Sequence, residues 1–146
     1  MVLVDVNILL YAFRSDSPDH EAYKGWLDSL VNSDGPYGVA DAALASFVRI
    51  ATHPRIFNPP SSLEQAIGFA AALRAQTNCV PVAPGPRYWD VFVRLCRDSG
   101  AKGNIVADAA FAALAVESGS EWVTTDRDYS RFPGLKWRHP LAKNAG

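Results

Sequence analysis

The chain begins MVLVDVNILLYAF (residues 1–13), and this stretch decides how the rest of the sequence is interpreted. Eleven of its thirteen residues are apolar, and the two exceptions are Asp5 and Asn7. The short β-branched segment 2–6 predicts a buried strand. An ionised carboxylate in apolar surroundings is costly unless a partner or a metal ion pairs with it. Asp5 is therefore a candidate functional residue at the end of the first strand.

The composition predicts a single globular domain over residues 1–146. Hydrophobic residues make up 49% and charged residues 20%, which excludes wholesale disorder. The net charge of −1 gives no overall argument for a polyanionic partner. No apolar run is long enough to cross a membrane, and no basic region precedes the first one, so we expect a cytoplasmic protein without a signal peptide. Cys79 and Cys96 lack metal-binding spacing and are expected to be buried thiols.

Predicted strands alternate with predicted helices along the chain. Apolar segments predict further strands at 37–40, 79–83, 121–125 and 135–139. Helical spacing, capping signals and alanine-rich composition predict helices at 17–31, 43–53, 61–76, 86–96 and 103–119. Pro81 places the strand at 79–83 at or near an edge of the sheet. Uninterrupted apolar strands separated by helices indicate an α/β sandwich around a mostly parallel sheet.

Two acidic residues follow predicted strands, and a third lies in an apolar helix. Ligands of parallel sheets bind outside the carboxyl ends of the strands, which is where Asp5 and Asp126 lie. Asp108 is the only charged residue within four positions on either side in the alanine-rich helix. A helix so poor in charge is expected to be largely buried, with its one acid facing a polar crevice. These three acids are therefore expected to meet.

Carboxylates brought together repel one another, so their meeting suggests a bound cation. Oxygen ligands without supporting histidine or cysteine suit Mg²⁺ or Mn²⁺. Each acid alone also has a plain structural explanation, as a helix cap, a turn former or an ion-pair partner. That explanation is strongest for Asp126, which stands beside Arg127 in a turn-like segment.

Three segments together carry a resemblance to a known family. DVNILLYAF (5–13), the alanine-rich helix with Asp108, and WVTTDRDYSRFPGLKW (122–137) resemble the PIN-domain ribonucleases, most of all the toxin of VapBC-type toxin–antitoxin pairs. RIATHPRIF (49–57), before a proline-rich loop, is similar to one subgroup of these toxins. The resemblance implies a PIN-like three-layer α/β sandwich with a mostly parallel sheet of four or five strands.

The resemblance also implies an activity and partners. It implies a Mg²⁺- or Mn²⁺-dependent endoribonuclease toxin that hydrolyses RNA, is neutralised by a cognate antitoxin and pairs as a homodimer. The family acids that hold metal match Asp5, Asp108 and Asp126. Polar positions that line the site match Asn7 and Thr124 or Thr125, and Arg127 is expected to contact substrate.

The second family acid is missing from this chain. It is usually a glutamate, and Ser46 stands in its place. Asp41, five residues earlier, is the nearest acid, but at ~100° per residue it lies on a different helix face from Ser46. Asp41 serves as a catalytic acid if it caps the helix and points into the crevice, and otherwise it is a plain N-cap.

Two other functions stay open from the sequence. A phosphatase with an aspartyl nucleophile also has an acid after the first strand, but it normally needs a second aspartate where this chain has Asn7. A catalytically weak PIN-like module that binds RNA or protein is favoured by Ser46 and opposed by the three remaining acids. RNA cleavage that depends on added metal distinguishes the enzyme from the binding module.

Overall fold

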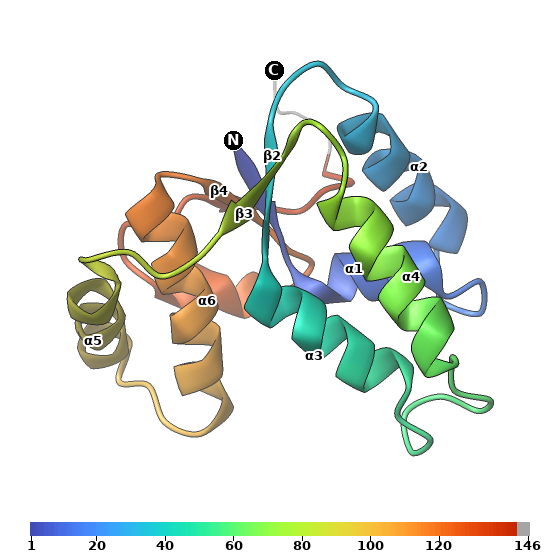
Figure 1. Cartoon of the computed structure of the whole chain (residues 1–146). Helices are drawn as coiled ribbons and strands as arrows, with labels where there is room; N and C mark the ends of the chain where they lie inside the picture. The colour runs from blue at the N-terminus through green and yellow to red at the C-terminus, as the bar shows by residue number, and fades with distance from the viewer. Residues whose placement is uncertain (143–146) are drawn as a thin grey trace.

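A computed structural model describes residues 1–142 as a five-stranded sheet with helices on both faces (Figure 1). The strands follow in the order β3-β2-β1-β4-β5, and every neighbouring pair is parallel. Their bounds are β1 Val2–Val4, β2 Tyr37–Ala40, β3 Cys79–Val82, β4 Glu121–Val123 and β5 Trp137–Arg138. This arrangement confirms the predicted α/β class and places the proline-containing β3 at an edge.

Six α-helices and one 3-10 helix connect the strands. They are α1 Val6–Phe13, α2 His20–Val31, α3 Asp41–Ala51, α4 Leu63–Arg74, α5 Tyr88–Ser99, α6 Asn104–Ser118 and η1 Arg127–Arg131. Figure 1 shows α1 to α4 on one side of the sheet and α5 with α6 on the other. Within residues 1–142 no helix has both the length and the apolar character needed to cross a membrane.

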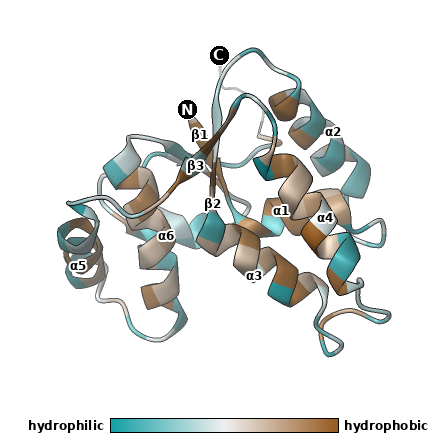
Figure 2. Cartoon of the chain, viewed as in Figure 1, coloured by the Kyte–Doolittle hydropathy of each residue, from teal (hydrophilic) through white to brown (hydrophobic). Residues whose placement is uncertain are grey.

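The core lies on both faces of the central strands. Leu3 and Val4 of β1 and Trp122 and Val123 of β4 are at most 1% exposed. In Figure 2 the strands are largely hydrophobic, whereas polar residues cover much of the outer surface of α2. The strands of a parallel sheet that is covered on both faces are continuously apolar. This is why apolar and polar residues do not alternate along these strands in the sequence.

The first strand is shorter than predicted, and an unpredicted helix follows it. β1 ends at Val4, and α1 begins at Val6 with Asp5 as its N-cap. The sequence signal was ambiguous because nearly every residue of the first segment is apolar, so neither the helical period nor the strand period stands out. As a result the first acid joins a strand to a helix, a more rigid position than a loop.

The starts of the other helices also differ from the prediction: α2, α4, α5 and α6 begin later, and α3 begins two residues earlier, at Asp41. The α2 helix begins at His20, not after Ser17, because residues 17–20 form a turn in which Asp19 has a left-handed conformation with φ of 57°. The α4 helix begins at Leu63, after a capping box formed by Ser62 and Gln65, whereas the prediction started at residue 61. The α5 helix begins at Tyr88. These shifts of one to three residues leave the topology unchanged.

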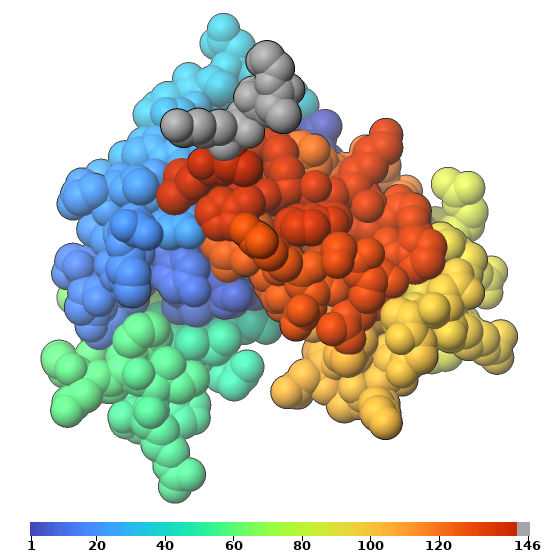
Figure 3. All heavy atoms as spheres, turned by 180° about the vertical axis from the view of Figure 1, so that it is seen from behind, coloured from blue at the N-terminus to red at the C-terminus, as the bar shows by residue number. Residues whose placement is uncertain are grey.

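The α6 helix is buried mainly in its second half. Ala109 and residues 112–115 are buried, whereas Asn104, Val106 and Ala107 in the first turn are exposed. The prediction of a largely buried helix was therefore wrong for its amino-terminal half. In Figure 3 a notch separates the residues before α6 (yellow-orange) from the segment between α3 and α4 (green). This notch exposes the start of α6, and Asp108 is half-buried.

Glycines on β2 and α4 offer a paired test of this packing. A Cβ atom at Gly38 would lie 3.1 Å from Val82 Cγ2 and 3.2 Å from Leu3 Cδ1, so Gly38→Val should lower the free energy of unfolding by about 1–3 kcal/mol. At Gly68, in the middle of α4, a Cβ would meet no atom within 4 Å. Gly68→Ala should raise that free energy by about 0.5–1 kcal/mol. Urea unfolding measures both, and changes of the same sign would contradict the packing described.

Candidate active site

Asp5 is a buried carboxylate held by two short hydrogen bonds. Its Oδ1 accepts from the backbone N–H of Val6 at 2.6 Å, and its Oδ2 accepts from the Thr124 hydroxyl at 2.6 Å. The Asp5 backbone N–H donates to the carbonyl of Val123 at 3.0 Å. With 5% of its surface exposed, the side chain is fixed in one orientation between β1, α1 and the end of β4.

Thr124 connects the first acid to Asp126. Its hydroxyl donates to Asp5 and also accepts from the backbone N–H of Asp126 at 3.0 Å. Asp126 in turn caps η1, because its Oδ1 accepts from the Asp128 backbone N–H at 2.9 Å. The second Asp126 carboxylate oxygen takes no part in that cap. The plain capping explanation for Asp126 is therefore correct, and it leaves one oxygen for other partners.

Asp108 reaches the same site from α6. Its Oδ1 accepts from the hydroxyl of Tyr129 at 3.4 Å, a long hydrogen bond that ties α6 to η1. Tyr129 is 3% exposed and packs against Trp122 and Phe132, so its ring is held firmly. The tyrosine was absent from the sequence-based site because it looks like an ordinary core aromatic, and no spacing signal connects it to Asp108.

The electrostatics show that the three acids share one site. Burial raises the pKa of Asp5 from 3.8 to about 6, against the two hydrogen bonds, and repulsion from Asp108 and Asp126 raises it further. Burial and then repulsion from Asp126 raise the pKa of Asp108, which the Tyr129 hydroxyl and Arg131 partly offset. Burial and the three carboxylates also raise the pKa of Tyr129. These acids were predicted to meet from distant parts of the chain, and the fold brings them together.

This donor set fits a hydrated divalent cation. Within residues 1–142 no group of three histidine, cysteine, aspartate or glutamate side chains is arranged to hold an ion on its own. Mg²⁺ keeps several of its waters and often takes only one or two carboxylates from the protein. A cation would also offset the cost of burying these charged carboxylates and their mutual repulsion, the two effects that raise the pKa of Asp5 and Asp108. Asp5 and Asp108, with Asp126 beside them, could therefore hold an ion partly through water.

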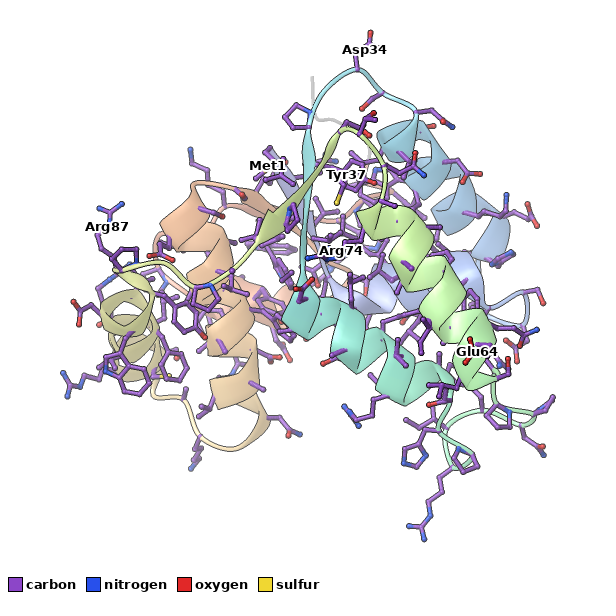
Figure 4. All side chains as sticks on the ribbon, in the orientation of Figure 1. Met1, Asp34, Tyr37, Glu64, Arg74 and Arg87 are labelled. Carbon is purple, nitrogen blue, oxygen red and sulfur yellow. The ribbon has the colours of Figure 1, made fainter. Side chains whose placement is uncertain are left out.

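Asp41 has a different partner from the other acids. It is the first residue of α3, its side chain is 70% exposed, and its Oδ1 accepts from Arg74 Nε at 2.8 Å. Figure 4 shows Arg74 reaching from the end of α4 towards the start of α3. Asp41 is not among the charges that act on Asp5 or Asp108. Its catalytic role stays a prediction.

Ser46 and Asp41 line the same cavity, which is mainly apolar. This cavity of about 320 Å³ lies between α3, α6 and the end of β3, and Ala107, Ala110 and Phe111 of α6 form its other wall. Ser46 therefore faces α6 across this cavity. The space it leaves is bordered by small apolar side chains, and the sequence alone did not indicate a cavity there.

The remaining predicted site residues lie around the three acids. Asn7 is half-buried in the first turn of α1, two residues after Asp5. Thr125 is half-buried between Thr124 and Asp126, and Arg127 is exposed at the start of η1. Their positions allow contact with a substrate at the acids, and their predicted roles remain untested.

Comparison with known proteins identifies similar chains. A family model described as PIN domain matches residues 2–135. The chain is similar to ribonuclease VapC43 of Mycobacterium tuberculosis, with 43% identity over 97% of this chain and 96% of that protein. It is also similar to ribonuclease VapC25 of the same species, with 39% identity over 96% and 99%. The structure of VapBC2 from Rickettsia felis, bound to a promoter DNA fragment, shares the fold with a TM-score of 0.67 and 16% identity, covering 95% of this chain and 98% of that one.

The raised pKa of Asp5 predicts how stability depends on pH without metal. The folded-state pKa of about 6 lies above the unfolded value of 3.8, so the stabilising effect of protonated Asp5 is complete below pH 3.8 and is lost as pH rises through about 6. The loss should reach about 3 kcal/mol. Urea unfolding in EDTA between about pH 4 and pH 7 measures it, with Asp5→Asn as the comparison. An equal pH slope in the two proteins would contradict the assignment to Asp5.

Proposed function

The chain belongs to the PIN-domain family, and from this premise we propose that it is a ribonuclease toxin that needs Mg²⁺ or Mn²⁺ and is held inactive by an antitoxin. The observation that carries the proposal is the meeting of Asp5, Asp108 and Asp126 at one end of a parallel sheet. The 43% identity to a ribonuclease over nearly the whole chain supports the same activity. The substrate is RNA, cut within the strand by hydrolysis of a phosphodiester bond.

In this proposal the acids provide the ion site. Asp5 and Asp108 would hold the ion, and Asp126 would contribute its second carboxylate oxygen, directly or through water. The ion would supply charge neutralisation at the scissile phosphate and activation of a water for attack. Asp41 stays outside this set and acts at most through its charge, because Arg74 already pairs with it.

The protein's other groups keep the acids in place. Thr124 orients the Asp5 carboxylate through its 2.6 Å hydrogen bond, and the Val6 N–H holds the second oxygen of that group. Tyr129 does the same for Asp108 from the buried side. Hydrogen bonds to the groups that hold an ion commonly change its affinity by ten- to a hundredfold. Asn7, Thr125 and Arg127 are placed to contact the substrate around the acids.

We also propose that the protein pairs as a homodimer through α5. Trp89 on this helix is 66% exposed, and its ring packs on that of Phe92, with ring centroids 5.4 Å apart. Leu95 is the single fully buried residue of α5 among those described. Val80 on the edge strand β3 is 39% exposed. An exposed tryptophan beside other apolar side chains is typical of a protein interface.

Metal-dependent cleavage tests the proposed activity. We expect the protein to cut single-stranded RNA with added Mg²⁺ or Mn²⁺ and to stop in EDTA. Asp108→Asn keeps the size of the side chain but removes its charge, so cleavage should fall at least a hundredfold while circular dichroism stays native. Gel-based cleavage assays measure the rate. RNA binding without cleavage under all these conditions would favour the binding-module alternative.

Asp41→Asn is the matched variant for that experiment. It makes the same chemical change at an acid that is paired with Arg74 and 70% exposed. We expect a loss of cleavage much smaller than that of Asp108→Asn. Equal losses in the two variants would contradict the assignment of the ion to Asp5, Asp108 and Asp126, and would place Asp41 among the essential acids.

Light scattering tests the proposed dimer. We expect the mass of two chains at micromolar concentration, and the mass of one chain for Trp89→Glu, because a buried charge without a partner destabilises an interface. Leu63→Glu is the matched control, since Leu63 is 55% exposed on α4, away from α5. A one-chain mass for the unmodified protein, or dissociation of both variants, would contradict an interface at Trp89.

A further inference from the structure

The site of the proposed nuclease has an electrostatic difficulty with its own substrate. The charges of Asp5, Asp108 and Asp126 repel one another, and Asp128 adds a further negative charge that acts on Asp108. An RNA strand brings one negative charge per phosphate. One bound divalent cation offsets part of this repulsion. Cationic side chains outside the ion site are needed to hold the phosphates that flank the cut bond.

One wall of the notch carries such cations. Residues 52–61, which lead from α3 to the N-cap of α4, are called the arm below. Figure 3 shows the arm projecting on one side of the notch, opposite the residues that precede α6. Arg55 is exposed on the arm, and Arg49 is exposed in the last turn of α3. Arg49 follows Ser46 by three residues, so it lies on the same side of α3 as Ser46, which borders the cavity against α6.

These two arginines have no acidic partner in the part of the chain that the structure describes. None of the ion pairs within residues 1–142 includes Arg49 or Arg55. Arg14, Arg74 and Arg138, by contrast, are each paired to a carboxylate at 2.8 Å or less. Arg49 and Arg55 are thus free to bind an anion. Ile56, next to Arg55, is 53% exposed and offers an apolar surface beside the charge.

The arm is an ordered structure, which a binding surface requires. Its base is closed by a hydrogen bond from the Ser61 N–H to the Ala51 carbonyl at 2.9 Å. Inside it, the backbone N–H groups of Ile56 and Phe57 both donate to the His53 carbonyl at 3.1 Å, and that of Arg55 donates to His53 Nδ1. A compact loop whose ends meet is often a functional element.

Arg14 fastens the arm to the rest of the protein. Its guanidinium carbon lies 4.2 Å from the centroid of the Phe57 ring, and its Nη1 donates to the Ser61 hydroxyl at 3.0 Å. Its other two nitrogens donate to Asp16 at 2.9 and 2.6 Å. The Arg14 side chain is only 10% exposed, so this cation is used for structure and not for binding.

The same short helix connects the arm to the acids. Asp5 is the N-cap of α1, and Arg14 is its C-cap. At 1.5 Å per residue, the nine steps from one cap to the other separate them by roughly 13–14 Å. One rigid element therefore sets the position of the arm relative to the first acid.

From these observations we propose that the arm and Arg49 form an RNA-contact surface. Arg49 and Arg55 bind phosphates next to the bond that is cut, Ile56 packs against a base, and Arg14 is a positioning residue that holds the arm in register with the acids. The proposal rests on the ribonuclease function proposed above. Single-stranded RNA fits this combination, because it presents both phosphates and unstacked base faces.

Binding is tested apart from cleavage by using Asp108→Asn as the background. The probe is a short single-stranded RNA oligonucleotide of mixed sequence, and fluorescence anisotropy measures its Kd over a range of salt concentrations. We expect Arg55→Ala and Arg49→Ala each to weaken binding about three- to tenfold and to reduce the slope of log K against log salt by about 0.7. Lys136→Ala is the matched control, because Lys136 is an exposed cation just before the amino end of β5, at the sheet edge away from the acids.

The results separate this proposal from the proposed function. Equal weakening by Lys136→Ala, or unchanged binding in both arginine variants, would overturn the arm as an RNA-contact surface while metal-dependent cleavage still stood. Unchanged RNA binding together with altered binding of a protein partner would reassign the arm to that partner. No RNA binding by the background protein would overturn the arm and speak against the nuclease as well.

Arg14→Lys tests the positioning role. Lysine keeps the charge but cannot donate to Asp16 and Ser61 in the same planar arrangement. We expect the RNA Kd to rise severalfold with the salt slope unchanged, and trypsin to cut after Arg55 faster than in the unmodified arm. Mn²⁺ affinity, measured by calorimetry in the chain with native Asp108, should stay the same. An unchanged Kd, or a changed Mn²⁺ affinity, would overturn the assignment.

Discussion

The burial of the Asp5 carboxylate is the constraint on which the rest of the structure depends. At 5% exposure it needs partners, and it has the Val6 N–H and the Thr124 hydroxyl, both at 2.6 Å. The first of these begins α1, and the second connects the ends of β1 and β4. Even so, the pKa of Asp5 rises to about 6, because hydrogen bonds do not fully replace lost hydration. A cation at this point would stabilise the ionised Asp5 carboxylate, which the hydrogen bonds of the fold stabilise only in part.

The remaining site is built outward from that carboxylate. The Thr124 hydroxyl accepts a hydrogen bond from the Asp126 backbone N–H. Asp126 caps η1, and Tyr129 of η1 donates its hydroxyl to Asp108. A continuous chain of contacts thus runs from β1 through β4 and η1 to α6. In the other direction, α1 runs from Asp5 to Arg14 and the arm. The acids and the arm are therefore both positioned by elements that start at Asp5. Such an arrangement suits an enzyme that must align an extended RNA strand with a single bond.

Much of the site was predictable from the sequence, for a reason that particular residues show. Asp5 and Asp126 stand directly after apolar strands, and parallel strands present their carboxyl ends to one edge. Asp108 was conspicuous because a helix with one charge in nine residues is unusual on a surface. Tyr129 was not predictable, since a buried tyrosine in the core and one that donates to an acid look alike in sequence. The exposure of the start of α6 was not predictable either, because a notch between segments that are far apart in the chain leaves no local signal in the sequence.

The sequence by itself determined the class of fold, the strands and the three acids, since each depends on local composition and on the rule that parallel strands end together. Only the tertiary structure decided the partners. It pairs Asp41 with Arg74 across 33 positions, turns Ser46 towards an apolar cavity, and uses Arg14 to hold the arm while leaving Arg49 and Arg55 unpaired within residues 1–142. The physical reason is that a charged side chain acts through its neighbours in space. Those neighbours come from distant segments, whose approach no local pattern in the sequence specifies.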